Sequence, residues 1–128
     1  MKIVIIKVDI SLADIIIESS CDYGSGKAVW NGHNKPHVGK VYRVEYDLTD
    51  ILRWGIEITK SDLKEYKINN KNDNCYIIGK LDKYYSDDVY DLKFGESVIQ
   101  LEVEGRNVPV GSFVLVKAES LEVYDLDD

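Results

Sequence analysis

Hydrophobic and polar residues alternate along most of this chain, and a period of two residues is typical of β-strands that bury one face. The alternation is clear over residues 38–47, 52–59, 97–104 and 113–117, and β-branched residues crowd residues 3–10. Glycine, asparagine and aspartate separate these segments, as they do at turns. The pattern therefore predicts an all-β protein made of short strands.

One short helix at most is expected, over residues 61–66, where Ser61 can serve as the N-cap of an incomplete capping box. The polar run at residues 69–74 cannot bury apolar surface, so we predict an exposed loop there. This loop is the natural boundary between two halves of the chain. The predicted organisation is a first β repeat at 1–60, a short helix and polar linker at 61–74, and a second β repeat at 75–128.

The chain contains an internal repeat, which a shared turn signature makes visible. Residues 32–39 and residues 105–111 both read G-x-N-x-P-(x)-V-G, with one residue fewer in the second copy. Glycine and proline restrict the backbone angles of a turn, so the shared signature implies the same local backbone twice.

Each copy offers about five short strands, which is the pattern of a small antiparallel barrel or sandwich. A unit of about 55 to 60 residues is marginal for an independent core, so we expect the copies to pack together. The predicted fold class is all-β, with two tandem five-stranded antiparallel small barrels packed as one pseudo-symmetric unit.

In strand number and turn placement, each copy resembles the oligonucleotide/oligosaccharide-binding (OB) barrel and the SH3-like barrel. The resemblance implies a small closed barrel. Residues 105–111 are too few for the helix usually found between the third and fourth OB strands, which leaves an SH3-like or irregular barrel open.

The charge balance bears on the choice of partner. The chain of 128 residues carries 23 acidic and 16 basic side chains, for a formal net charge of −7. Nucleic-acid binding draws most of its affinity from phosphate neutralisation, so an acidic chain starts at a disadvantage. The same electrostatics favour a basic protein partner.

The chain carries no sign of a membrane segment. No apolar run approaches the roughly 20 residues that cross a bilayer. Lys7 and Asp9 interrupt the apolar start, and no small-residue cleavage site follows it, so we expect no signal peptide and a cytoplasmic protein.

Candidate metal ligands and nucleophiles are few. His33 and His37 are four positions apart, but a proline between them prevents the helix that would place both imidazoles on one face. Cys21 and Cys75 belong to no C-x₂-C pair, and in a cytoplasmic protein we expect two independent reduced thiols. We predict no metal site, no cofactor and no catalytic residue.

Aromatic and acidic residues supply the candidate binding sites. The chain has nine tyrosines and two tryptophans, and such side chains are enriched at protein interfaces. The candidates for an acidic, tyrosine-rich face are Tyr84, Tyr85, Asp87, Asp88, Glu102 and Glu104. The candidates for a stacking surface in the less acidic first copy are Trp30, Tyr42 and Trp54, together with Arg43.

The function that these features favour is non-enzymatic capture of a basic partner protein through the acidic, tyrosine-rich face. In size, charge and expected compartment the chain resembles bacterial immunity proteins, which neutralise a toxin, and this resemblance implies an immunity or inhibitor role. Two alternatives remain open at this stage. One is an OB-like barrel that binds single-stranded nucleic acid or oligosaccharide, and the other is a small enzyme with a site between the repeats.

Overall fold

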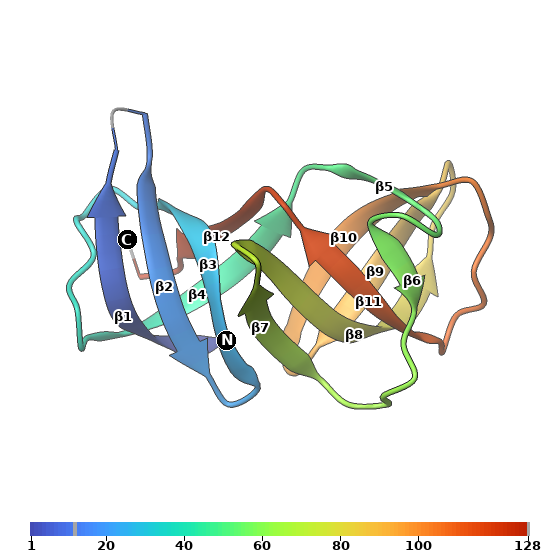
Figure 1. Ribbon diagram of the computed structural model, residues 1–128, viewed down its shortest axis with the longest axis horizontal. Helices are drawn as coiled ribbons and strands as arrows, with labels where there is room; N and C mark the ends of the chain where they lie inside the picture. Colours follow the sequence, from blue (N-terminus) through green and yellow to red (C-terminus); the bar gives the residue numbers. More distant parts are fainter. Residues whose placement is uncertain (12, 128) are drawn as a thin grey trace.

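The computed structural model describes residues 1–11 and 13–127, and its architecture consists of twelve β-strands (Figure 1). This part of the chain contains no helix, so the all-β prediction is confirmed. The strands are β1 (Lys2–Ile10), β2 (Ile15–Cys21), β3 (Gly24–Asn31), β4 (Val41–Leu48), β5 (Ile51–Arg53), β6 (Ile58–Lys60), β7 (Lys67–Lys71), β8 (Asn74–Tyr84), β9 (Val89–Phe94), β10 (Ser97–Glu104), β11 (Phe113–Ala118) and β12 (Leu121–Asp125).

Five strands close into a barrel. β1, β2 and β3 form an antiparallel meander, and β4 returns to pair with β1. β12 then pairs antiparallel with β4 and parallel with β3, which joins the two edges of the sheet. The strand that closes this barrel is therefore the last one in the chain, and Figure 1 shows it among the strands of the first half.

The second half forms a similar curved sheet. β8, β9 and β10 make a meander, and β11 pairs with β8. β5 pairs in parallel with β10, and β6 pairs with β11. An isolated bridge between Trp54 and Ile58 links the chain beyond β5 to the start of β6.

β12 thus pairs in the first half, and β5 and β6, which precede residues 61–74, pair in the second half. In the β12–β3 ladder Val123 lies opposite Trp30, and in the β5–β10 ladder Leu52 lies opposite Val103. Trp30 and Val103 are equivalent positions of the repeat, because 103 minus 30 is the offset of 73 that also relates Gly32 to Gly105. The two parallel ladders therefore use the same register.

Hydrogen bonds join the connection that leads to β5 with the connection that leads to β12. The β4–β5 connection carries Asp50, and the β11–β12 connection carries Ser120. The Asp50 carboxylate accepts hydrogen bonds from the Ser120 backbone N–H at 3.0 Å and from the Ser120 hydroxyl at 2.8 Å.

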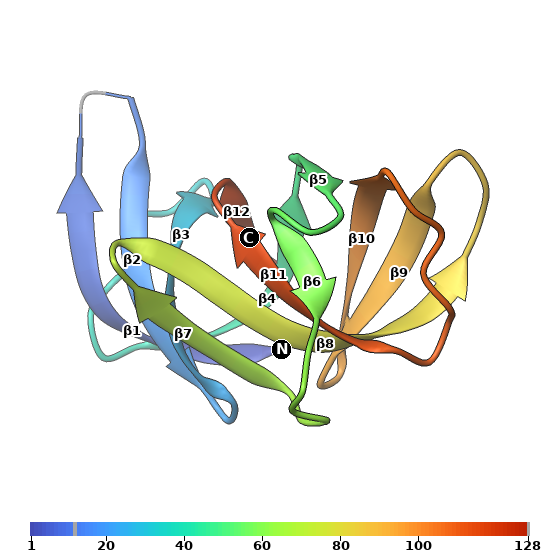
Figure 2. The same cartoon turned by 45° about the vertical axis from the view of Figure 1, so that its right-hand side comes forward.

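One hydrophobic core runs through both halves. The alternation seen in the sequence places every second residue of β10 inside, since its burial alternates strictly along the strand. Aromatic rings join the halves: Phe94 of β9 packs against Tyr46 of β4 and against Tyr23, with ring centroids 6.0 and 5.4 Å apart. β7 and the long strand β8 add a hairpin that crosses between the halves (Figure 2).

The predicted strand over residues 52–59 is wrong, because a turn interrupts it. Gly55 has a φ of +88°, a region that favours glycine. The Glu57 carboxylate accepts hydrogen bonds from the Arg53 backbone N–H at 3.0 Å and from the Arg53 guanidinium at 2.6 to 3.2 Å. This contact holds the pKa of Glu57 at about 2, well below its usual value.

Two other local predictions also differ from the structure. Residues 61–66 form no helix, because the Ser61 hydroxyl bonds the backbone N–H and C=O of Leu63 and so favours a tight turn. The polar run at 69–74 is largely part of the β7–β8 hairpin. Its turn residues Asn72 and Asp73 have φ values of +52° and +64°, as the favoured two-residue hairpin turn requires.

Packing of β8 against β3 makes one cysteine a probe of the core. Cys75 is buried, and its Sγ atom lies only 2.9 Å from where a Cβ atom on Gly26 would stand. Burial raises the pKa of the Cys75 thiol to about 12. In a Cys21→Ser variant titrated with Ellman's reagent at pH 8, we expect Cys75 to react at least about a thousand times more slowly than in urea. Reaction at the unfolded rate would contradict this packing.

Candidate functional site

A groove runs along the seam between the two halves, where β4 and β10 lie side by side. The two strands are close in space but share no ladder among the described residues. Two cavities, of about 440 and 290 Å³, open along this line, and residues of β4 and β10 line both. We call the two cavities together the seam groove.

The charged side chains that line the seam groove are all acidic. Lysine, arginine and histidine are missing from the lining of both cavities as the structure describes them. The larger cavity carries Asp47, Asp50 and Glu102, and the smaller one carries Glu45 and Glu96.

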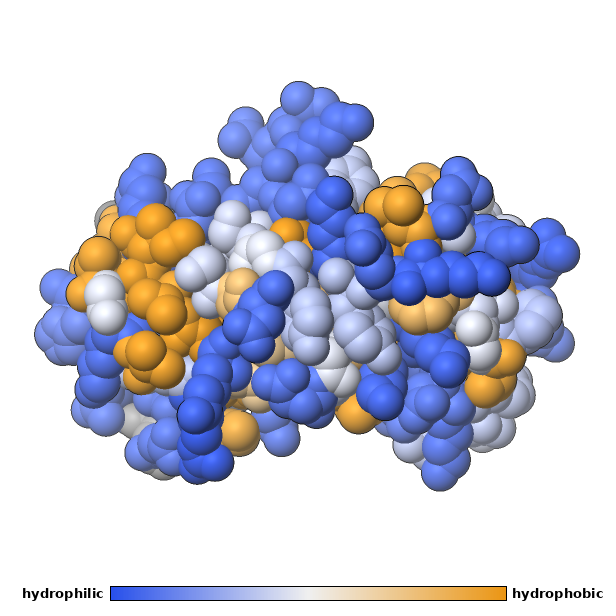
Figure 3. Space-filling view, turned by 90° about the horizontal axis from the view of Figure 1, so that it is seen from below, coloured by the Kyte–Doolittle hydropathy of each residue, from blue (hydrophilic) through white to orange (hydrophobic). Residues whose placement is uncertain are grey.

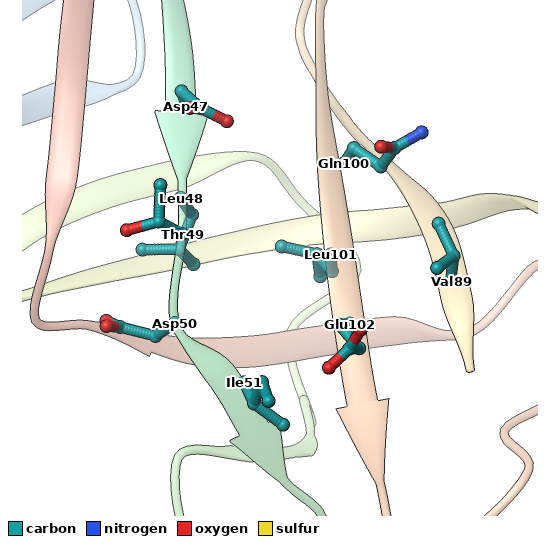
Figure 4. Close-up of a pocket in the computed structure, with 9 residues that line it drawn as sticks. All are labelled: Asp47, Leu48, Thr49, Asp50, Ile51, Val89, Gln100, Leu101 and Glu102. Atoms are coloured by element: carbon teal, nitrogen blue, oxygen red, sulfur yellow. The ribbon is translucent and has the colours of Figure 1, made fainter. Parts of the chain in front are cut away.

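The carboxylates differ in their partners. In Figure 4 the Asp47 carboxylate points across the groove toward β10, whereas Asp50 is turned away from β10, in keeping with its bonds to Ser120. Neither Asp47 nor Glu102 forms a hydrogen bond or an ion pair through its side chain with any other described residue. Asp47 also lies opposite Glu122 in the β4–β12 ladder, and like charges directly opposite each other are destabilising. The larger cavity therefore holds negative charge that no cationic group among its described lining residues neutralises.

Four predicted binding residues lie on the β8–β9 hairpin, at the edge of this acidic region. The turn residues Asp87 and Asp88 have positive φ values, and the Asp88 carbonyl accepts a hydrogen bond from the Val103 N–H at 2.9 Å. This contact places the turn beside Glu102. Tyr84 and Tyr85 are exposed near the hairpin tip and do not line the groove.

The two tyrosines have contacts of their own. The Tyr84 ring packs on Tyr90 with centroids 4.9 Å apart, and the Tyr85 hydroxyl donates a hydrogen bond to Asp91 at 2.7 Å. This bond raises the pKa of Tyr85. Glu104 is exposed on β10 and lies opposite Arg53 in the β10–β5 ladder. Of the predicted acidic face, the structure brings Asp88 and Glu102 close together, and the two tyrosines lie beside them.

The expectation of an exposed stacking surface is wrong for two of its three rings. Trp30 is 4% exposed and Tyr42 is 7% exposed, and their rings meet edge to face with centroids 4.9 Å apart. The Trp30 indole N–H donates to the Asn34 carbonyl, and the Tyr42 hydroxyl accepts from the His37 N–H. The alternation of β3 and β4 points both rings toward the core. From there each ring forms a hydrogen bond to the backbone of the loop that carries the first copy of the turn signature.

Sequence reasoning missed the acidic residues that the first half supplies. Glu45 and Asp47 share the outward face of β4, which the alternation does indicate. No pattern in the sequence indicates that this face lies against β10, because that proximity depends on strands far apart in the chain.

The cysteines and histidines are the remaining candidates for nucleophilic chemistry or metal binding. The Cys21 thiol is half-buried, and this burial raises its pKa, while deeper burial raises the pKa of the Cys75 thiol to about 12. His33 and His37 lie on the exposed loop between β3 and β4. Across residues 1–11 and 13–127, no group of three or more histidine, cysteine or acidic side chains could hold a metal ion.

The surface also carries an aliphatic patch on the first half. Val4 and Val41 are partners in the β1–β4 ladder and are both exposed, and Ile6 and Val38 are exposed nearby. Seen from below, the largest hydrophobic area lies over this half (Figure 3).

Comparison of the chain with protein-family models, with curated proteins and with solved structures found no match. In the described part of the chain there is also no helix long and apolar enough to cross a membrane.

The unneutralised charge predicts that the seam groove lowers stability. Replacing Asp47 and Glu102 with Asn and Gln removes like-charge repulsion but keeps the shape of both side chains. We expect the double variant to gain about 0.5–1 kcal/mol in free energy of unfolding at low salt, measured by urea denaturation. The gain should shrink at high salt because the repulsion is screened.

The matched control is Asp62→Asn with Glu65→Gln, which removes the same charge from exposed positions outside the groove. This control should change stability by less than about 0.5 kcal/mol. A clear loss of stability in the groove variant would contradict the account, because it would show that the two carboxylates stabilise the fold.

Proposed function

We propose that this protein is a non-enzymatic binding module, of the immunity or inhibitor kind, that captures a basic partner protein in the seam groove. The observation that carries the proposal is the groove itself, which brings five carboxylates together without a lysine, arginine or histidine in its lining. The one other charged group there is the N-terminal ammonium of Met1, which lines the smaller cavity and donates a hydrogen bond to the Val44 carbonyl at 3.3 Å. Asp88, at the hairpin turn beside Glu102, extends the acidic region.

The rim of the groove suits lysine and arginine side chains. Val98 and Ile51, 56% and 52% exposed, lie at the groove and can contact the aliphatic stems of these long residues. The charged ends of these side chains can then pair with the carboxylates of Asp47 and Glu102, which line the groove. A potential of one sign in a cleft also steers a partner of opposite charge and speeds its association.

We further propose that the two halves are tandem OB-like barrels related by a pseudo-twofold axis. In support, the first barrel has the strand order β1-β2-β3-β12-β4 with its closing strand parallel to β3, which is the order of the OB barrel. The second half repeats the meander and the parallel ladder in the same register.

Nucleic-acid or sugar binding, the usual role of the OB barrel, has less support. OB domains bind such ligands on the face of their second and third strands, and stacking needs exposed rings there. The outward faces of β2, β3, β9 and β10 carry no aromatic residue, because Trp30, Tyr90 and Phe94 point inward. On β10 that face instead carries Glu102 and Glu104.

The test is affinity capture from lysate of the source organism at low salt, with nuclease added and the retained proteins identified by mass spectrometry. We expect the wild-type chain to retain one dominant basic protein, and an Asp47→Lys, Glu102→Lys variant to lose it. The reason is that charge reversal in the groove turns attraction into repulsion.

The control variant is Asp62→Lys with Glu65→Lys, which changes net charge equally but leaves the groove intact, so it should keep the partner. Equal loss in both variants would show that only net charge matters and would contradict the proposed site. Retention that disappears with nuclease treatment would favour the nucleic-acid alternative.

A further inference from the structure

A second cleft, in the second half, has the opposite charge to the seam groove. Its volume is about 300 Å³, and the loop that carries the second copy of the turn signature forms one wall. Its lining residues are Trp54, Lys60, Arg106, Val108, Pro109 and Ser112. These include two cations, one aromatic ring and no carboxylate, which is unusual for a protein with a net charge of −7.

The two cations are available to a ligand. Arg106 lies over the Trp54 ring, 5.8 Å from its centroid, and this contact leaves its N–H groups free to bond an anion. Neither Lys60 nor Arg106 takes part in an ion pair with the part of the chain that the structure describes. Val108 and Pro109 add an apolar surface to the same cleft.

In the first half, an acidic segment lies beside the equivalent loop. Lys35 and His37 of the first copy of the turn signature, with Lys40 just after it, line a cleft of about 370 Å³ there. Two aspartates at the C-terminal end of the chain, Asp125 and Asp127, line the same cleft. Arg43 of β4 donates hydrogen bonds to both carboxylate oxygens of Asp127, at 2.5 and 3.2 Å.

The parallel ladders explain the difference between the two clefts. Tyr124 of β12 lies opposite Asn31, and Arg53 of β5 lies opposite Glu104. Asn31 and Glu104 are equivalent positions of the repeat, 73 residues apart. The residue after Tyr124 and the residue after Arg53 therefore reach the same place against their loops. In the first half that residue is Asp125, the start of an acidic segment. In the second half it is Trp54, and the chain turns away at Gly55.

We infer that the second cleft binds an acidic peptide segment of a partner protein, with aspartates two positions apart in a tight turn, as in residues 125–127, where the Asp125 carboxylate accepts a hydrogen bond from the Asp127 N–H at 3.0 Å. The two carboxylates pair with Lys60 and Arg106, and the residue between them packs on Trp54, Val108 and Pro109. This site is separate from the seam groove and does not depend on the function proposed for it.

The test uses the full chain and the synthetic peptide N-acetyl-Tyr-Asp-Leu-Asp-amide, which copies residues 124–127. Binding is followed by NMR through the indole N–H signal of Trp54, assigned with a Trp54→Phe variant. We expect a saturable shift of this signal, and about tenfold weaker binding to a Lys60→Gln, Arg106→Gln variant, because charge-assisted hydrogen bonds are lost.

Three controls establish whether the peptide binds in this cleft and through its carboxylates. The peptide with Asn in place of both Asp residues should not bind. A Lys64→Gln, Lys93→Gln variant, which loses the same charge at exposed positions outside the cleft, should bind as the wild type does. The groove variant Asp47→Asn, Glu102→Gln should also bind as the wild type does.

Several results would overturn the inference. They are an unchanged Trp54 signal at millimolar peptide, equal affinity for the Asn peptide, or undiminished binding to a Lys60→Gln, Arg106→Gln variant whose spectrum shows that it is folded. Shifts confined to Arg43 and its neighbours would also overturn it, because the peptide would then be replacing the chain's own tail in the first half.

Discussion

The structure depends on strands that pair outside their own repeat and so join its two halves. β12 closes the five-stranded barrel through its parallel ladder with β3, and β5 forms the second parallel ladder, with β10. β12 and β5 each bury a central residue completely, Val123 and Leu52. Burying such a side chain contributes about 1.5–3 kcal/mol, so neither half keeps its full core without the other. Asp50 and Ser120 fasten the two connections where they meet.

The same strand pairing also forms the two surfaces for which we propose a function, the seam groove and the cationic cleft. Because β5 continues from β4 into the second half, β4 is drawn alongside β10, and the outward carboxylates of both strands face one groove. Such a cluster is costly for the isolated protein, since like charges repel, and a basic partner would relieve the repulsion. The same pairing places the residue after each parallel ladder against a loop that carries the turn signature. That residue begins the acidic segment that lines the cleft of the first half, and it is Trp54 in the cationic cleft of the second.

Local patterns predicted the elements well where a residue's own chemistry decides the outcome. The alternation over 97–104 matches β10 residue for residue. Predictions failed where two local tendencies compete. Trp54 and Ile56 continue an alternating pattern, but Gly55 turns the chain between them. The polar run was expected to be a loop, but Asn72 and Asp73 adopt the positive φ values of a hairpin turn. The seam groove was only partly predictable. Glu102 and Asp88 are visible as acidic clusters, but their proximity to Asp47 follows from strand pairing between distant segments.

Nuclear Overhauser contacts between backbone protons of the parallel ladders test the central claim most directly. The observed pairing predicts contacts of residues 122–124 with residues 29–31, and of residues 51–53 with residues 102–104. The arrangement in which each repeat closes on its own strand would instead give contacts of 122–124 with 102–104 and of 51–53 with 29–31. Finding the second set would contradict this pairing, and with it the origin of both the seam groove and the cationic cleft.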